Sequence, residues 1–175
     1  EDAGVYARHG ATLMFRDSQI VDNQGESGVF LEHSQLILIN SQVNGNWGSG
    51  VIASQNSSVS LRNTTVHANA GSGIHVKMGS AIEALGSHIW GNGAVGIHMR
   101  TGSSGEVHDS AINANQQQGL EVSGNSTLDV YGGMVGWNGM HGVWVSEHAF
   151  LRLIDAAVSF NLGHGLVVGR DGGVI

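Results

Sequence analysis

Asparagine recurs at one fixed interval, and this interval constrains the fold more than any other feature of the chain. Seven asparagines follow one another in steps of 23 residues, at Asn23, Asn46, Asn69, Asn92, Asn115, Asn138 and Asn161. A glycine column keeps the same period at Gly50, Gly73, Gly96, Gly119, Gly142 and Gly165, and Gly4 and Gly28 extend it with one residue of slack. Self-similarity with a period of about 20 to 50 residues is the signature of a stacked repeat protein.

Each repeat contains three short segments in which apolar and polar residues alternate. In the repeat that begins at Gly119, Leu120 and Val122 are the apolar positions of the first segment, and Leu128 and Val130 those of the second. A period of two predicts strands with one buried face. Three such strands leave no room for a helix, so each repeat must bury its apolar face against its neighbours. We therefore expect residue n to lie over residue n+23, about 4.8 Å away.

Three turn columns carry a more specific prediction. The bend between the second and third strands holds only Asp, Asn or Gly: Asp17, Asn40, Asn63, Gly86, Asp109, Gly132 and Asp155. These residues enter the left-handed region most readily, so the column predicts positive φ. The asparagine column is expected to bond stacked amides to one another and to turn backbone. A serine column that includes Ser103 is interpreted as turn chemistry, with Ser103 exposed.

Composition excludes several classes of protein. The 175 residues suit one domain, and 41% of them are hydrophobic, which is enough for a core. The 28 glycines do not recur every third residue, which excludes collagen, and the absence of cysteine excludes a disulfide scaffold. A formal charge of −7 with seven Lys and Arg disfavours general binding to nucleic acid. No apolar run approaches the roughly 20 residues of a membrane helix.

The repeat resembles the right-handed parallel β-helix of the pectin-lyase-like superfamily over all 175 residues. The stretch Asp109-Ser110-Ala111-Ile112-Asn113-Ala114-Asn115, followed by Gly119-Leu120-Glu121-Val122, carries the resemblance. It implies an all-β, single-stranded parallel β-helix, a solenoid with 23-residue coils and three short strands per coil. A left-handed hexapeptide helix is the main competitor, but it requires a six-residue period. We predict one domain, residues 1–175, of about 7.5 coils. Both ends fall inside a repeat, so a segment of a longer solenoid or a subunit that stacks end to end is expected.

The resemblance also implies that sugar chains lie along the outward face of the first strand in each coil. The expected binding residues there are His75, Lys77, His98, Arg100, Glu121 and Trp144. We interpret the first four as a basic cluster that could hold an anionic polysaccharide, with the Trp144 ring under a sugar. A solvated surface with scattered histidines is the competing interpretation. Tyr6, Phe30 and Ile52 on the same face are expected to form an exposed apolar strip that suits a protein partner.

The outward face of the second strand carries an acidic column of Glu83, Glu106 and Asp129, with Arg152 next. Its spacing of about 4.8 Å is similar to the roughly 5–5.5 Å that separates the carboxyl groups of retaining glycosidases. Crowded carboxylates would raise a pKa or recruit a cation such as Ca²⁺. The alternative is an exposed acidic stripe that salt screens. His108 lies beside this column.

Gly163-His164-Gly165-Leu166 resembles the Gly-His-Gly element of polygalacturonases, which implies a catalytic role for His164. The chain departs from that family because it has no Asn-Thr-Asp, Asp-Asp or Arg-Ile-Lys motif, and His141-Gly142 repeats the element one coil earlier. Without proline, the Asp-Pro-His-Asp motif of alginate epimerases is also impossible. The sequence assigns no catalytic residue outright. Glu106, Asp129, His108 and His164 are the candidates, and no metal site is assigned apart from the Ca²⁺ hypothesis.

Short turns decide the first functional hypothesis. Enzymes of this superfamily build clefts from long loops, and nearly every turn here has the minimum length. We therefore predict a non-catalytic extracellular or cell-surface solenoid segment, such as a stalk, adhesin or filament part, with a polysaccharide or surface glycan as partner. The alternative is a polysaccharide-active lyase, hydrolase or epimerase. No nucleic-acid partner, membrane span or other cofactor is expected.

Overall fold

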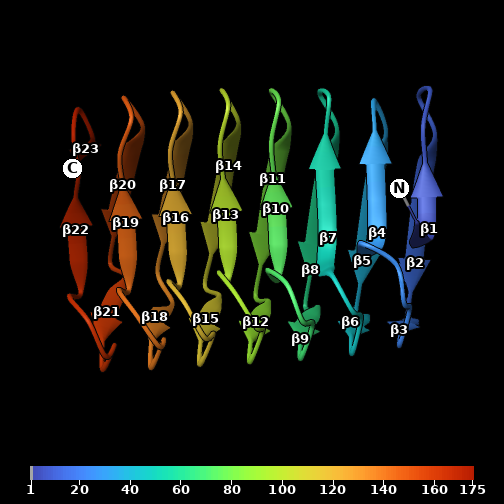
Figure 1. Ribbon diagram of the computed structural model, residues 1–175, viewed down its shortest axis with the longest axis horizontal. Helices are drawn as coiled ribbons and strands as arrows, with labels where there is room; N and C mark the ends of the chain where they lie inside the picture. The colour runs from blue at the N-terminus through green and yellow to red at the C-terminus, as the bar shows by residue number, and fades with distance from the viewer. Residues whose placement is uncertain (1) are drawn as a thin grey trace.

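The protein is a parallel β-solenoid in which successive coils lie side by side along one axis (Figure 1). The computed structural model describes residues 2–175, so the predicted domain start at Glu1 lies outside the described residues. The described chain forms three parallel sheets of eight, eight and seven strands and contains no helix. The predicted all-β class with three short strands per coil is confirmed.

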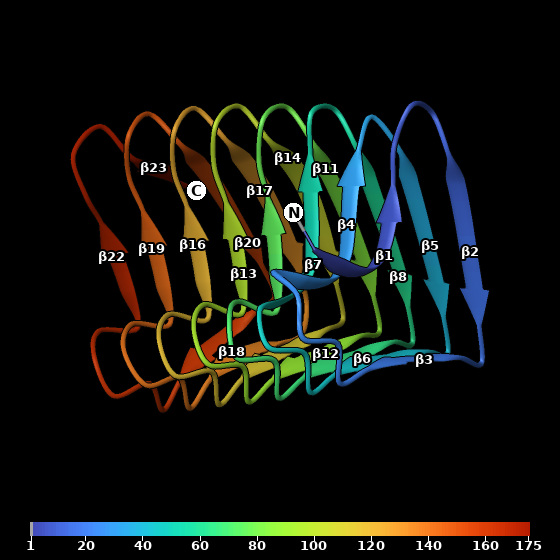
Figure 2. The ribbon, with the colours of Figure 1, turned by 45° about the vertical axis from the view of Figure 1, so that its right-hand side comes forward.

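The three sheets take one strand each from a coil, and their order follows the chain (Figure 2). The first sheet contains β1 (Ala3–Ala7), β4 (Ser27–Glu32), β7 (Ser49–Ser54), β10 (Ile74–Val76), β13 (Ile97–Met99), β16 (Leu120–Val122), β19 (Val143–Val145) and β22 (Leu166–Val168). The second contains β2 (Thr12–Arg16), β5 (Gln35–Ile39), β8 (Ser58–Arg62), β11 (Ala81–Leu85), β14 (Ser104–His108), β17 (Thr127–Tyr131), β20 (Phe150–Ile154) and β23 (Gly173–Val174). The third contains β3 (Gln19–Val21), β6 (Gln42–Asn44), β9 (Thr65–His67), β12 (His88–Trp90), β15 (Ala111–Asn113), β18 (Met134–Gly136) and β21 (Ala157–Ser159).

The strand register follows the 23-residue period. Ile74 pairs with Ile97, and Ile97 pairs with Leu120. The register differs only where the glycine column showed slack, since Val29 pairs with Val5 on one side and with Val51 on the other. Equal positions of successive coils therefore form columns, and every outward column is a row of neighbouring side chains.

The core is a stack of aliphatic side chains inside the coil. In one coil, Ile74, Val76, Ile82, Ala84 and Ile89 are all at most 3% exposed. Burying one large aliphatic side chain stabilises the fold by about 1.5–3 kcal/mol, and each coil repeats this set. At the last coil Leu166 is 40% exposed and Val168 48%. These side chains are more open because no further coil of the described chain covers them.

The asparagine column forms the predicted ladder. The Nδ2 of Asn92 donates to the Oδ1 of Asn115 at 3.0 Å and to the carbonyl of Val66 at 3.2 Å. The Oδ1 of Asn92 in turn accepts from the Nδ2 and the backbone N–H of Asn69. The five asparagines from Asn46 to Asn138 are at most 1% exposed. The ladder thus satisfies turn groups that would otherwise be buried without partners.

Two hydroxyl columns form further ladders at the other turns. The first hydroxyl column consists of Ser18, Ser41, Thr64, Ser87 and Ser110, and the backbone N–H of each of the first four donates to the hydroxyl oxygen of the next. The distance from the N–H of Ser87 to the Oγ of Ser110 is 3.0 Å. In the second hydroxyl column, the N–H of Ser103 donates to the Oγ of Ser126 at 3.1 Å, and the Oγ of Ser103 donates to the carbonyl of Arg100. Ser103 is 1% exposed, so the expectation that it is exposed is wrong. The reason is that this turn folds its hydroxyl groups inward to bond the neighbouring coil.

The backbone of the bend between the second and third sheets is left-handed in every coil, as predicted. The φ angles of this column range from 46° at Asp109 to 66° at Gly132. Asp, Asn and Gly pay the smallest penalty for this conformation, which explains why the column holds only these residues.

Candidate functional site

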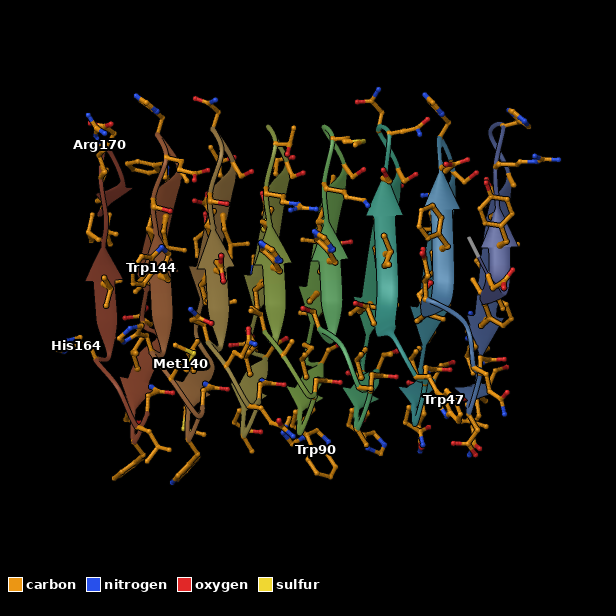
Figure 3. The ribbon with its side chains drawn as sticks, viewed as in Figure 1. Trp47, Trp90, Met140, Trp144, His164 and Arg170 are labelled. Atoms are coloured by element: carbon orange, nitrogen blue, oxygen red, sulfur yellow. The ribbon has the colours of Figure 1, made fainter. Side chains whose placement is uncertain are left out.

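The outer face of the first sheet brings four of the six predicted binding residues into one column. His75 pairs with His98, His98 with Glu121, and Glu121 with Trp144. Lys77 and Arg100 follow β10 and β13 by one residue, in the adjacent outward column. Figure 3 shows Trp144, Met140, His164 and Arg170 among the C-terminal coils of this face. The column thus changes along the axis from imidazoles to a carboxyl group and then to an indole.

The two imidazoles of this column stack face to face and are uncharged at neutral pH. Their ring centroids lie 4.6 Å apart with an interplanar angle of 3°. Burial, reinforced by His98 and Arg100, lowers the pKa of His75 to about 3. Burial and Arg100 lower the pKa of His98 to about 4. The expected basic cluster is therefore corrected, because only Lys77 and Arg100 carry a positive charge at pH 7.

The lowered pKa values predict a pH-dependent stability. In the unfolded chain both histidines have the ordinary pKa of about 6.5, so below that pH the unfolded state binds more protons than the folded state. The two uncharged histidines therefore cost no stability above about pH 6.5. Below that pH the free energy of unfolding decreases as the pH drops toward the folded pKa values. We expect the melting temperature to fall between pH 7 and pH 4, and His98→Gln to flatten this slope.

The matched control for this pH measurement is His33→Gln. His33 is exposed, and the next coil carries Gln55 opposite it, hydrogen-bonded through the backbone. Its replacement should leave the slope of melting temperature against pH as in the native protein. If His98→Gln has the same slope as the native protein, burial of the imidazole pair is not the cause.

The apolar strip predicted at the N-terminal end of this face is wrong. Phe30 is 4% exposed and Ile52 8%, although both point outward, and only Tyr6 is more open at 41%. The Tyr6 ring lies 5.7 Å from the Phe30 ring, and the Nζ of Lys77 lies 5.8 Å from the centroid of the Phe30 ring. Long neighbouring side chains therefore cover these residues, as amphipathic chains often do on sheet surfaces. Lys77 consequently leans toward the N-terminal coils.

The carboxyl group of Glu121 is partly buried beside an imidazole on this face. Its Oε1 lies 3.7 Å from the Nε2 of His98, and its side chain is 26% exposed. Burial raises the pKa of Glu121, with a further increase from Glu147 and an opposing effect from Arg100. A carboxyl group with a raised pKa beside an uncharged imidazole is a pair of acid and base groups of the kind found at proton-transfer sites.

A shallow hollow of about 730 Å³ surrounds Glu121 and Trp144. It is also lined by residues that the sequence reasoning missed: Gln118, His141, Glu147 and Arg170. The Nδ1 of His141 accepts from the N–H of His164 at 3.0 Å, and the His141 ring lies 5.5 Å from the Trp144 ring. The Oε1 of Gln118 is buried and accepts no hydrogen bond from residues 2–175. The sequence contains one signal for this hollow. In the column just before the repeat glycine, small or apolar residues are replaced by Gln118 and then by His141 and His164.

Three of the four catalytic candidates lie together, and His164 lies apart from them. Glu106, His108 and Asp129 lie on β14 and β17 of the second sheet, whereas His164 lies just before β22 of the first sheet. His164 is exposed and stacks on His141 with ring centroids 5.3 Å apart. The Gly-His-Gly resemblance is therefore a repeat feature of the first sheet, distant in the fold from the acidic column.

Each carboxylate of the acidic column has a partner in the described chain. Glu106 Oε2 lies 3.2 Å from the Nε2 of His108, and Asp129 Oδ2 lies 3.3 Å from the Nη1 of Arg152. Glu83 Oε2 accepts from the Oγ of Ser60 at 3.0 Å. Residues 2–175 hold no group of three His, Cys, Asp or Glu side chains that could bind a metal ion, so the Ca²⁺ hypothesis at Glu83, Glu106 and Asp129 gains no support.

The comparison with protein families identifies the fold. The model of the family "Right handed beta helix region" matches residues 3–161. The chain belongs to this family. As a β-helix it also superposes on solved structures, and no curated protein matches it. Residues 2–175 contain no helix, and therefore none that could span a membrane.

Three solved β-helices resemble the chain along nearly its whole length. A double mutant of the periplasmic alginate epimerase AlgG gives a TM-score of 0.83 at 20% identity, and a single mutant of the same enzyme gives 0.80 at 19%. The A-module of the mannuronan C-5 epimerase AlgE6 from Azotobacter vinelandii gives 0.67 at 15%. Each match covers at least 96% of this chain, but the chain spans only 47% of the two AlgG chains and 59% of the AlgE6 module.

Proposed function

We propose that this β-helix acts on an acidic polysaccharide that lies along the outer face of the first sheet. The reaction class begins with removal of the proton from the carbon next to a uronate carboxyl group, the step that lyases and epimerases share. An epimerase then returns a proton to the opposite face of that carbon, whereas a lyase breaks the bond to the glycosidic oxygen on the neighbouring carbon and leaves a double bond. Glu121 and His98 are the proton-transferring pair, and Trp144 supports a sugar ring. Lys77 and Arg100 supply the cations that bind substrate carboxylates.

The observation that carries this proposal is the environment of Glu121. Burial raises its pKa, while the neighbouring His98, 3.7 Å away, is held neutral. This places an uncharged imidazole, which can accept a proton, beside a carboxyl group whose protonated form is favoured by burial. Both lie next to Trp144 in the row, and Glu121 and Trp144 line the same hollow, where an indole face offers an apolar surface to a sugar.

The structural neighbours support the enzyme hypothesis over the non-catalytic stalk, adhesin or filament part. All three are named as epimerases of alginate or mannuronan, and the two AlgG structures are named as periplasmic, which supports an extracytoplasmic location. This chain lacks proline and therefore the Asp-Pro-His-Asp motif, so its chemistry would rest on Glu121 and His98 instead. We propose polysaccharide modification by the β-helix, without assigning it the neighbours' substrate.

Proton NMR in deuterated water, with alginate and polygalacturonate as substrates, tests the proposal. Inversion at C5 with deuterium uptake identifies an epimerase, and unsaturated ends identify a lyase. We expect Glu121→Gln to lower turnover about 100-fold or more, in the range typical of a lost acid–base catalyst. Glu26→Gln, an exposed carboxylate in the turn before β4, should retain turnover.

Two results would contradict the proposal. New reducing ends without inversion or unsaturation would mean hydrolysis, and binding of either polymer without any product would favour the non-catalytic hypothesis. Equal turnover in Glu121→Gln and the native protein would remove Glu121 from the mechanism. The amide spectrum of each variant reports whether the fold is intact.

A further inference from the structure

A second trough runs along the outer face of the second sheet, away from the proposed site. It encloses about 640 Å³. One column of outward side chains along it is small, namely Ser58, Ala81, Ser104 and Thr127, and the Phe150 ring follows them on the next strand. The adjacent outward column holds Glu83, Glu106 and Asp129. The hollow forms because the side chains of one column are small and those of the adjacent column are longer, and it extends across several coils.

The acidic side of the trough has unused hydrogen-bonding capacity. The contacts of these carboxylates all engage one oxygen, which is Oε2 of Glu83, Oε2 of Glu106 and Oδ2 of Asp129. Within residues 2–175, the other oxygen of each accepts no hydrogen bond. Three free carboxylate oxygens therefore repeat at the coil spacing of about 4.8 Å.

The opposite side of the trough offers further free polar groups. The side-chain hydroxyl groups of Ser58, Ser104 and Thr127 form no side-chain hydrogen bond with the described chain. The charged groups that line the trough are three carboxylates and Arg152, which leaves it formally negative. A polyanion would be repelled, whereas sugar hydroxyl groups could donate charge-assisted hydrogen bonds to the carboxylates.

We propose that this trough binds an uncharged, hydroxyl-rich glycan chain that lies along the solenoid axis. The coil spacing is comparable to the length of one pyranose residue. The three coils that contain β11, β14 and β17 therefore each present a free carboxylate oxygen and a hydroxyl group or small side chain to successive sugars. The Phe150 ring provides an apolar surface for a sugar at the C-terminal end. The two faces of the β-helix would then select different glycans by charge.

A titration of the isotope-labelled protein with neutral hexasaccharides of β-1,4-linked glucose, mannose and xylose tests this proposal. We expect at least one to shift amide signals of β8, β11, β14 and β17, with an affinity that changes little with salt. A hexamer of mannuronate should leave these signals in place. This readout is independent of turnover and of the first sheet, so its failure is distinguishable from failure of the proposed function.

Two matched variants locate the binding. Ser104→Phe fills the trough at an exposed position and should weaken the affinity about tenfold or more. Thr12→Phe lies in the same outward column on β2, outside the trough, and should bind as the native protein does. If Ser104→Phe does not fold, Glu106→Gln removes one carboxylate without a change of shape and should also weaken binding.

The proposal is overturned if no neutral hexasaccharide shifts the second-sheet amides. It is also overturned if Ser104→Phe, correctly folded, binds as tightly as Thr12→Phe. Binding of the mannuronate hexamer in the trough would contradict the charge argument and with it the assigned ligand class.

Discussion

Asn92→Ala should lower the free energy of unfolding by about 3–5 kcal/mol, because one amide serves several buried groups. Truncation removes both donors that Asn92 directs to Asn115 and to the carbonyl of Val66. It also removes the oxygen that accepts from the side chain and backbone of Asn69. Each buried polar group left without a partner costs about 1–3 kcal/mol, and the position is fully buried, so water cannot replace the amide easily.

Urea denaturation of Asn92→Ala and of Gln116→Ala measures this effect. Gln116 follows the next asparagine of the ladder and is exposed, so its truncation should change stability by less than about 0.5 kcal/mol. Ser103 is unsuitable as the neutral control because its hydroxyl belongs to a buried ladder. Equal losses at Asn92 and Gln116 would contradict the role of the stacked amides.

Gly96→Ala is the second large effect, with an expected loss of about 2–4 kcal/mol. A Cβ at this position would lie 2.6 Å from the carbonyl oxygen of Gly119, 2.6 Å from the Cγ2 of Ile112 and 2.8 Å from the Nδ2 of Asn115. The Gly119 carbonyl accepts from the N–H of Ile97, and the Asn115 amide belongs to the ladder. Relief of the clash therefore requires separation of hydrogen-bonded coils, which is a severe form of overpacking.

Gly165→Ala is the matched control, since Gly165 occupies the same column at the last coil. Its nearest neighbour to an added Cβ is the Cγ1 of Val158 at 3.6 Å, an ordinary contact. We expect a loss below about 1 kcal/mol at Gly165 in the same urea experiment. Similar losses at both glycines would mean that backbone conformation, and not contact with the next coil, selects glycine in this column.

The catalytic and binding hypotheses depended on burial and on contacts between coils, which the order of residues in the repeat does not show. Succession in the sequence placed His75, His98, Glu121 and Trp144 in one row, and the register confirms the row. It did not indicate that burial makes both imidazoles neutral, since desolvation depends on what neighbouring coils place over a side chain. The sequence also did not predict that Gln118, His141 and Arg170 line the hollow around Glu121, because turns of different coils bring them there.

The sequence by itself determined the solenoid, the coil length, the asparagine ladder and the left-handed bend. These follow from local rules repeated at a fixed period: alternation sets the strands, residue type sets the turn backbone, and equal phase sets the neighbour in the next coil. Only the tertiary structure decided which outward residues are covered, as Phe30 and Ser103 are, and where the surface is hollow. Burial and shape arise from side chains of several coils and two adjacent columns together, so no single position of the repeat encodes them.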